Sequence, residues 1–181
     1  PLKDLRVGYV GDDPNRPELE VLKSLGVKLV PIRLPRQKAA MIVNTILHAE
    51  AGTAFDELIR ANRLDRIGTL WPTGFRASHF ITAVDYLRAQ RLRSQLMQEM
   101  SEVMNQVDLY VGGNDLAITN LTGHPTVCLP NGFVKRNGAE VPTSLTFTGR
   151  LFGESELLAV AHAYQEATGH HLKRPPQDTW Q

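Results

Sequence analysis

The chain has 181 residues, of which 42% are hydrophobic and 22% charged, and its formal net charge is +1. Such a chain is long enough to bury a sizeable core, and its nearly balanced charge gives no argument for a nucleic-acid or membrane partner. A single cysteine, Cys128, excludes an internal disulfide framework. We recognise no signal peptide and no apolar run as long as a membrane span, so the expected location is cytoplasmic.

The N-terminal part predicts a β-α-β unit. Residues 5–10 and 27–34 are apolar runs typical of strands, and residues 18–25 between them carry a helical stripe. Pro17 suits the first helical position and Gly26 the position just past the end. A crossover of this kind predicts parallel strands. Because the Gly-x-Gly-x-x-Gly spacing of dinucleotide sites is missing, a structural unit is favoured over a nucleotide-binding one.

Two helices and a loop are predicted in the middle of the chain. Residues 37–62 have a wide apolar face suited to covering a sheet, with a break expected near Gly52. Residues 63–78 are typical of a loop because Gly and Pro interrupt them. Residues 81–107 repeat apolar positions at helical spacing. We expect His48 to be partly buried and hydrogen-bonded, since no acidic residue shares its helical face for metal binding.

The arginines of this region have two interpretations. Arg66 and Arg76 lie near Trp71 and Phe75, which are suited to lining a cleft, and a guanidinium fork suits a carboxylate. We therefore take Arg76 as a candidate substrate-binding residue, with a solvated surface arginine as the alternative. The arginines of residues 81–107 are expected to be exposed, because acidic residues dilute their charge (Arg88, Arg91 and Arg93).

The last part of the chain predicts the rest of the sheet. Residues 108–112 are a short strand, and the apolar run 126–129 is a buried strand that closes at Pro130. Cys128 in that run is expected to pack in the core. Asn137-Gly138 is a strong turn signal.

The turn predicts antiparallel pairing of residues 125–133 with 142–151, so the sheet is expected to be mixed. An amphipathic helix is predicted over 154–168, ending before Gly169.

Three stretches resemble the amidase signature family. These are Ala83-Val-Asp-Tyr-Leu-Arg-Ala-Gln-Arg-Leu-Arg93, the segment from Asn120-Leu-Thr-Gly-His-Pro to Leu129-Pro-Asn-Gly-Phe133, and Pro142-Thr-Ser-Leu-Thr-Phe-Thr-Gly-Arg-Leu-Phe-Gly-Glu154. The family comprises serine amidohydrolases and includes the amidase component of tRNA-dependent amidotransferases. The resemblance implies an α/β fold, with helices flanking a mixed sheet, that forms the C-terminal portion of an enzyme acting on carboxamides.

The family's catalytic residues are missing from this chain. Similar enzymes use a serine, a second serine in a cis peptide and a lysine, with both serines in a run of the form Gly-Gly-Ser-Ser-Gly-Gly-Ser. This chain contains no Ser-Ser dipeptide, and Gly112-Gly113 is followed by Asn114. It also lacks Gly-x-Ser-x-Gly, Walker and His-Glu-x-x-His motifs. We therefore assign no catalytic, cofactor-binding or metal-binding residue, and expect the chain alone to be inactive.

The resemblance implies three substrate-binding residues. The amidase components of the amidotransferases hold the substrate carboxylate with an arginine, here Arg76 or Arg66, and the amino group of glutamine with an aspartate, here Asp115. Asn120 of the late motif completes the set. For Asp115 the alternative is an N-cap of the following helical turn. The Asn114-Asp115 pair favours an amidotransferase, whereas the shortened loop after Gly112 and the presence of His124 favour a general amidase, and both remain open.

The expected organisation is one domain over residues 1–176 with a disordered tail over 177–181. The expected partners are a small carboxamide in the full-length enzyme and, for an amidotransferase, further subunits, with no nucleic acid bound directly and no membrane. Loss of the catalytic part would expose apolar surface, so we expect the isolated chain to self-associate. The alternative function is a stand-alone, non-catalytic binding module.

Overall fold

The computed structural model describes residues 1–35, 39–64, 71–113 and 116–174. A five-stranded sheet has the order β2 (Lys28–Ile32), β1 (Arg6–Val10), β3 (Leu109–Val111), β5 (Ala139–Gly149), β4 (Thr126–Arg136). β1 runs parallel to β2 and β3, whereas β5 runs antiparallel to β3 and β4. The predicted α/β fold with a mixed sheet is confirmed, and so is the antiparallel hairpin.

Helices cover both faces of this sheet. Leu109 and Val111 of β3 pack in one core cluster with α1 (Pro17–Ser24) and α7 (Glu154–Thr168), while Tyr110 packs in the other. That second cluster holds α2 (Ala39–Ala54), α5 (Ala83–Met104) and α6 (Leu116–Thr122). Alternation of side chains along a strand explains why neighbouring residues of β3 serve opposite cores.

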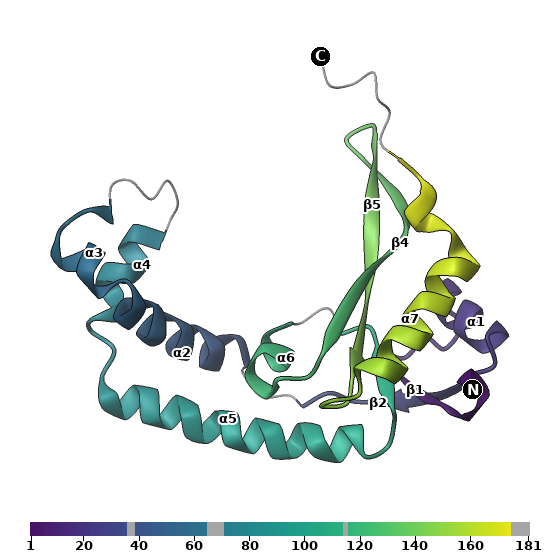
Figure 1. Cartoon of the computed structure of the whole chain (residues 1–181), viewed down its shortest axis with the longest axis horizontal. Coiled ribbons are helices and arrows are strands. Elements are labelled where there is room, and N and C mark those ends of the chain that lie inside the picture. Colours follow the sequence, from purple (N-terminus) through teal and green to yellow (C-terminus); the bar gives the residue numbers. More distant parts are fainter. Residues whose placement is uncertain (36–38, 65–70, 114–115, 175–181) are drawn as a thin grey trace.

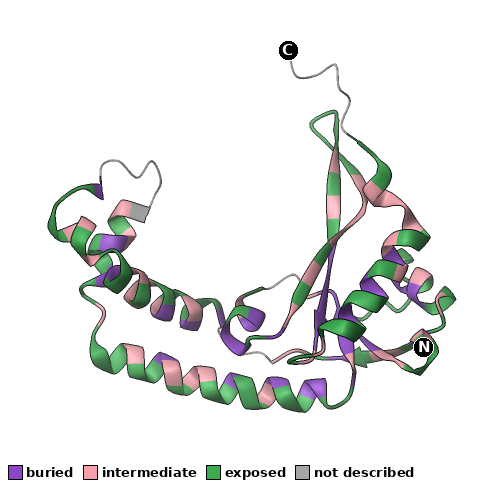
Figure 2. Ribbon diagram, in the orientation of Figure 1, coloured by how far each residue is buried: buried purple, intermediate pink, exposed green. Residues whose placement is uncertain are grey.

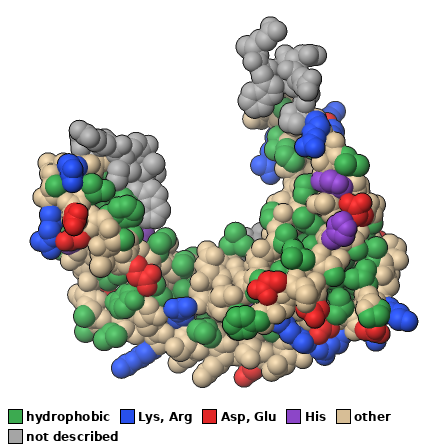
Figure 3. All heavy atoms as spheres, viewed as in Figure 1, with side chains coloured by type: hydrophobic (Ala, Val, Ile, Leu, Met, Phe, Trp, Pro, Cys, Tyr) green, Lys and Arg blue, Asp and Glu red, His purple; other side chains and the backbone are tan. Residues whose placement is uncertain are grey.

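The chain forms an open U (Figure 1). One arm holds α2, the short α3 (Asp56–Arg60) and α4 (Trp71–Ser78), and the other holds the β4–β5 hairpin and α7. α5 spans the base between the arms. Buried residues gather where the helices meet the sheet, while the hairpin tip and the outer face of α5 are exposed (Figure 2). The hollow between the arms is open in the space-filling view (Figure 3).

The N-terminal prediction is confirmed. β1, α1 and β2 follow one another as a parallel β-α-β unit, with Pro17 as the first residue of α1. Gly26 adopts φ +86° just past the helix, a conformation that favours glycine. The helix predictions over 81–107 and 154–168 are also confirmed, as α5 and α7.

Two predictions about glycines were wrong. Residues 71–78, expected to be a loop, form α4, and α2 passes through Gly52 to end at Ala54. A Cβ at Gly52 would lie 2.0 Å from Ser78 Oγ, and one at Gly74 would lie 3.3 Å from His48 Nε2. Both glycines therefore allow α2 and α4 to approach closely. His48 is half-buried and its Nδ1 lies 2.7 Å from Asn44 O, as expected.

The prediction for β4 was also partly wrong. The strand does not close at Pro130 but continues through a bulge between Pro130 and Phe133 to Arg136. β4 is an edge strand, where the missing N–H of a proline is tolerated. Cys128 is exposed, contrary to expectation, because its neighbours Val127 and Leu129 take the core-facing positions.

Further departures concern α5 and the chain ends. Arg93 is half-buried rather than exposed, and its Nε donates to Leu121 O at 2.7 Å. Val84 and Leu87 lie on the predicted apolar stripe yet are 64% and 57% exposed. The tail 177–181 lies outside the described residues.

Candidate substrate-binding site

α6 is held rigidly at the bottom of the hollow (Figure 1). Ile118 and Leu121 bury their side chains in the core shared with α2 and α5. At its end Leu121 O accepts from Arg93 Nε, and Gly123 N donates to Thr119 O at 2.8 Å. Gly123 has φ +80°, which favours glycine at this position. These contacts leave Asn120 on the exposed side of the helix.

The Gly-His-Pro turn connects α6 to β4. His124 is 8% exposed, and its Nδ1 lies 2.8 Å from Thr122 Oγ1. The Thr122 hydroxyl donates to Ile118 O at 2.9 Å, so the hydrogen-bond pattern assigns the ring proton to Nδ1. Burial lowers the pKa of His124, which favours the neutral ring. Pro125 O accepts from Gly149 N at 2.9 Å and so fixes the turn to the end of β5.

Arg76 projects from the opposite arm. Its neighbour Phe75 is buried and packs on Phe55 with ring centroids 4.8 Å apart, which anchors α4. Arg76 itself is exposed. Within the part of the chain that the structure describes, no hydrogen bond or ion pair engages its guanidinium. A free guanidinium beside the hollow can bind a ligand carboxylate.

The structure does not bring the candidate residues together. Arg76 lies on α4 and Asn120 on α6, elements that border the hollow from different sides (Figures 1 and 3). Asp115 and Arg66 lie outside the described residues, so the N-cap interpretation of Asp115 stays a prediction. Among the residues described, no group of three or more His, Cys, Asp or Glu side chains could hold a metal ion.

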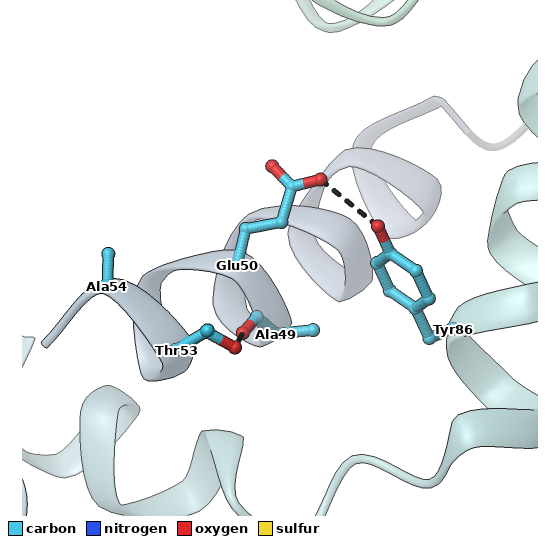
Figure 4. Close-up of a pocket in the computed structure, with 5 residues that line it drawn as sticks. All are labelled: Ala49, Glu50, Thr53, Ala54 and Tyr86. Carbon is cyan, nitrogen blue, oxygen red and sulfur yellow. Dashed lines mark hydrogen bonds between the residues drawn. The ribbon is translucent and has the colours of Figure 1, made fainter. Parts of the chain in front are cut away.

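One polar group was missed as a unit by sequence reasoning. Tyr86 of α5 donates a hydrogen bond to Glu50 Oε1 of α2 at 3.2 Å, and a cavity opens beside them (Figure 4). The two residues are 36 positions apart and belong to different helices. No local spacing in the sequence signals such a pair.

No model of a known protein family matches the chain. Curated relatives do match. A putative amidase, AmiD, of Mycobacterium tuberculosis is 28% identical over 140 residues, which cover 63% of this chain and 29% of the relative. The amidase component (GatA type) of the glutamyl-tRNA(Gln) amidotransferase of Legionella pneumophila is 30% identical over 156 residues, which cover 70% of this chain and 31% of the relative.

Solved structures share the fold. A crystal structure of an amidase superposes with a TM-score of 0.71 over 91% of this chain and 45% of its own, at 19% identity. An aryl acylamidase of the amidase signature family gives 0.68 over 95% of this chain and 46% of its own, at 15% identity. The chain belongs to the amidase signature family. The resemblance stated from three sequence motifs is thereby confirmed.

This amidase-signature chain spans between 29% and 49% of the length of the curated relatives it matches. Its match to the corresponding amidotransferase component of a Janthinobacterium strain extends over 236 residues and covers 98% of the chain. Because the chain has only 181 residues, the relative carries segments inside the matched region that this chain lacks. The short connection from β3 to α6, residues 112–115, is one place that agrees with such a loss.

No described helix is both long and apolar enough to cross a bilayer.

Proposed function

We propose that this chain is the C-terminal part of an amidase-signature enzyme that hydrolyses carboxamides or transfers their ammonia. Residues 1–176 form one unit of that enzyme, which supplies part of the sheet and one wall of the substrate cleft. The observation that carries the proposal is the open hollow between the two arms, in a chain that matches less than half of each relative. The Ser-cisSer-Lys triad of the family would come from the preceding part of the protein.

The roles of the candidate residues follow from their chemistry. Arg76 holds a substrate carboxylate through its unengaged guanidinium. Asn120 offers an amide that both donates and accepts hydrogen bonds from a rigid helix, and Asp115 contacts an amino group. Spread over different elements, these residues converge only around a substrate that occupies the hollow.

The first test is the nucleotide sequence upstream of the codon for Pro1. A lysine codon followed in frame by a Gly-Gly-Ser-Ser-Gly-Gly-Ser run supports the proposal, and the joined protein is then expected to release ammonia from carboxamides while the chain alone does not. A start codon directly before Pro1, with no separately encoded catalytic part, instead favours the stand-alone binding module.

The second test separates the substrate classes. In the joined protein, Arg76→Ala should lower kcat/KM for amides that carry a carboxylate, and leave that for uncharged amides near the wild-type value. Arg88→Ala, an exposed arginine on α5, is the matched control. Equal losses on both kinds of amide would contradict the assigned role of Arg76.

The choice between amidase and amidotransferase depends on partners. The relatives include subunits of glutamyl-tRNA(Gln) amidotransferases, which suggests partner subunits for the joined protein. Purification of the joined protein from its own cells tests this. Stoichiometric co-purification of further subunits supports an amidotransferase, and an active protein without them supports a general amidase.

A further inference from the structure

A cavity of about 550 Å³ opens between α2 and α5 (Figure 4). Among the described residues it is lined by Ala49, Glu50, Thr53, Ala54 and Tyr86. Its size lies within the usual range for small-molecule sites, roughly 300–1,000 Å³. Its walls are mainly methyl groups and an aromatic ring, and Glu50 is the one charged residue among those described lining it.

The carboxylate of Glu50 is positioned but not neutralised. Its Oε1 accepts a hydrogen bond from the Tyr86 hydroxyl at 3.2 Å, and that hydroxyl in turn accepts from Gln90 Nε2 at 2.9 Å. The two contacts fix the tyrosine and aim the carboxylate. No described residue forms an ion pair with Glu50, and its Oε2 has no described hydrogen-bond partner.

Neighbouring charges do not supply the missing cation. The adjacent hollow shares Ala49 and Thr53 with this cavity and contains Arg60. Arg60 Nε donates to Asp56 Oδ2 at 2.7 Å, so its charge is already paired. His79 Nε2 also lies 3.7 Å from Asp56 rather than turning toward Glu50.

The chemistry of the lining selects a class of ligand. One carboxylate among methyl groups offers too few oxygen ligands for Ca²⁺ or Mg²⁺, and it repels anions. An ammonium head group would form a charge-assisted hydrogen bond with Glu50, and the Tyr86 ring is an aromatic wall of the kind that attracts cations. The methyl groups of Ala49, Thr53 and Ala54 would cover an apolar body.

We propose that the cavity between α2 and α5 binds a small organic ammonium ion, with Glu50 as its counter-ion and Tyr86 as one wall. This site is separate from the candidate residues Arg76, Asp115 and Asn120. It does not depend on catalysis, so it can be tested with the chain by itself.

The test is a titration of the full chain with benzylammonium, followed by the backbone NMR signals of Ala49, Thr53 and Tyr86. Benzyl alcohol, which has the same ring and no charge, is the matched probe. We expect saturable shifts with benzylammonium in the millimolar range or below, and binding of benzyl alcohol about tenfold weaker. Benzylammonium that causes no saturable shift, or the two probes binding equally, would overturn the proposal.

Variants identify the counter-ion. Glu50→Gln keeps the shape of the side chain and should weaken benzylammonium binding about tenfold while leaving benzyl alcohol unchanged. Glu102→Gln, on the exposed face of α5, removes the same charge elsewhere and should leave both affinities unchanged. Tyr86→Phe keeps the ring and should change affinity by less than about threefold. Circular dichroism of each variant confirms folding, and an unchanged benzylammonium affinity in folded Glu50→Gln would refute the assignment.

Discussion

Arg150 Nη2 lies 2.7 Å from Asp108 Oδ1 and so ties the end of β5 to the start of β3. Asp108 Oδ2 also accepts from the backbone N–H of Arg6 at 2.7 Å, at the start of β1. Arg150 Nε donates to Val107 O at 2.8 Å, near the end of α5. One carboxylate therefore fastens three strands that lie side by side but are far apart in sequence.

We predict that Asp108→Asn destabilises the fold at neutral pH by about 1–3 kcal/mol, because it leaves two arginines without their acceptor. Burial raises the pKa of Asp108, but hydrogen bonds from Arg6 and the charges of Arg150 and Arg6 lower it by more. A carboxyl pKa that is lowered on folding stabilises the protein above the unfolded value, near 3.9, and this contribution fades as pH falls through the folded value.

The measurement is urea unfolding followed by circular dichroism at about pH 7 and pH 3, on either side of the unfolded carboxyl pKa. The difference between wild type and Asp108→Asn should shrink at the lower pH. Asp12→Asn, in an exposed loop, is the control and should cost little at either pH. An equal loss at both values would show that shape rather than charge is responsible.

His124 should make stability depend on pH in a second range. Burial lowers its pKa, so the folded state holds a neutral ring where the unfolded chain, with a pKa near 6.5, takes up a proton. The contribution is therefore complete above about pH 6.5 and is lost as pH falls through the lower folded value. Urea midpoints between about pH 7 and pH 5 should fall for the wild type, and fall less for His124→Gln.

His162→Gln provides the comparison, because His162 is exposed on α7. It should retain the pH dependence of the wild type. A His124→Gln protein with the same slope as the wild type would mean that the buried imidazole does not cause the effect.

Gly52→Ala should destabilise the protein even though alanine is the better helix former. Its Cβ would lie 2.0 Å from Ser78 Oγ and 2.7 Å from Ser78 Cβ, so α2 and α4 would have to separate. We expect a cost of about 1–3 kcal/mol in thermal or urea unfolding. Ser78→Gly removes both clashing atoms, and the double variant Gly52→Ala with Ser78→Gly should lose less than the two single costs added together. Strict additivity would contradict the proposed contact.

The fold could be predicted where local signals agree. Pro17, Gly26 and the Asn137-Gly138 turn each fix a local backbone geometry, and the elements that they delimit are found in the structure. Signals that depend on a distant partner were misread. Gly74 resembles a loop residue in sequence, yet it marks where α4 rests on His48, 26 positions earlier in the chain.

The same limit applies to sites. Val127, Cys128 and Leu129 are all apolar, and only the edge position of β4 decides that Cys128 faces outward. The pairing of Glu50 with Tyr86 depends on how α2 crosses α5, which no spacing in the sequence encodes. The family motifs, in contrast, carried the correct fold because they are short and continuous.

Self-association of the isolated chain is the last prediction, and α5 offers the surface for it. Phe80, Val84 and Leu87 follow one another at helical spacing and are 86%, 64% and 57% exposed. A contiguous apolar stripe promotes association because covering it removes apolar surface from water. Sedimentation velocity should show a mean mass that rises with protein concentration.

Replacement of the stripe by the double variant Phe80→Ser and Val84→Ser should suppress this rise. Phe152→Ser is the matched control, since Phe152 is 95% exposed but lies in the turn before α7, away from α5. It should associate like the wild type. A chain that sediments as one monomeric species from micromolar to near-millimolar concentration would contradict the prediction, and equal suppression by Phe152→Ser would move the interface from α5 to the α7 side of the molecule.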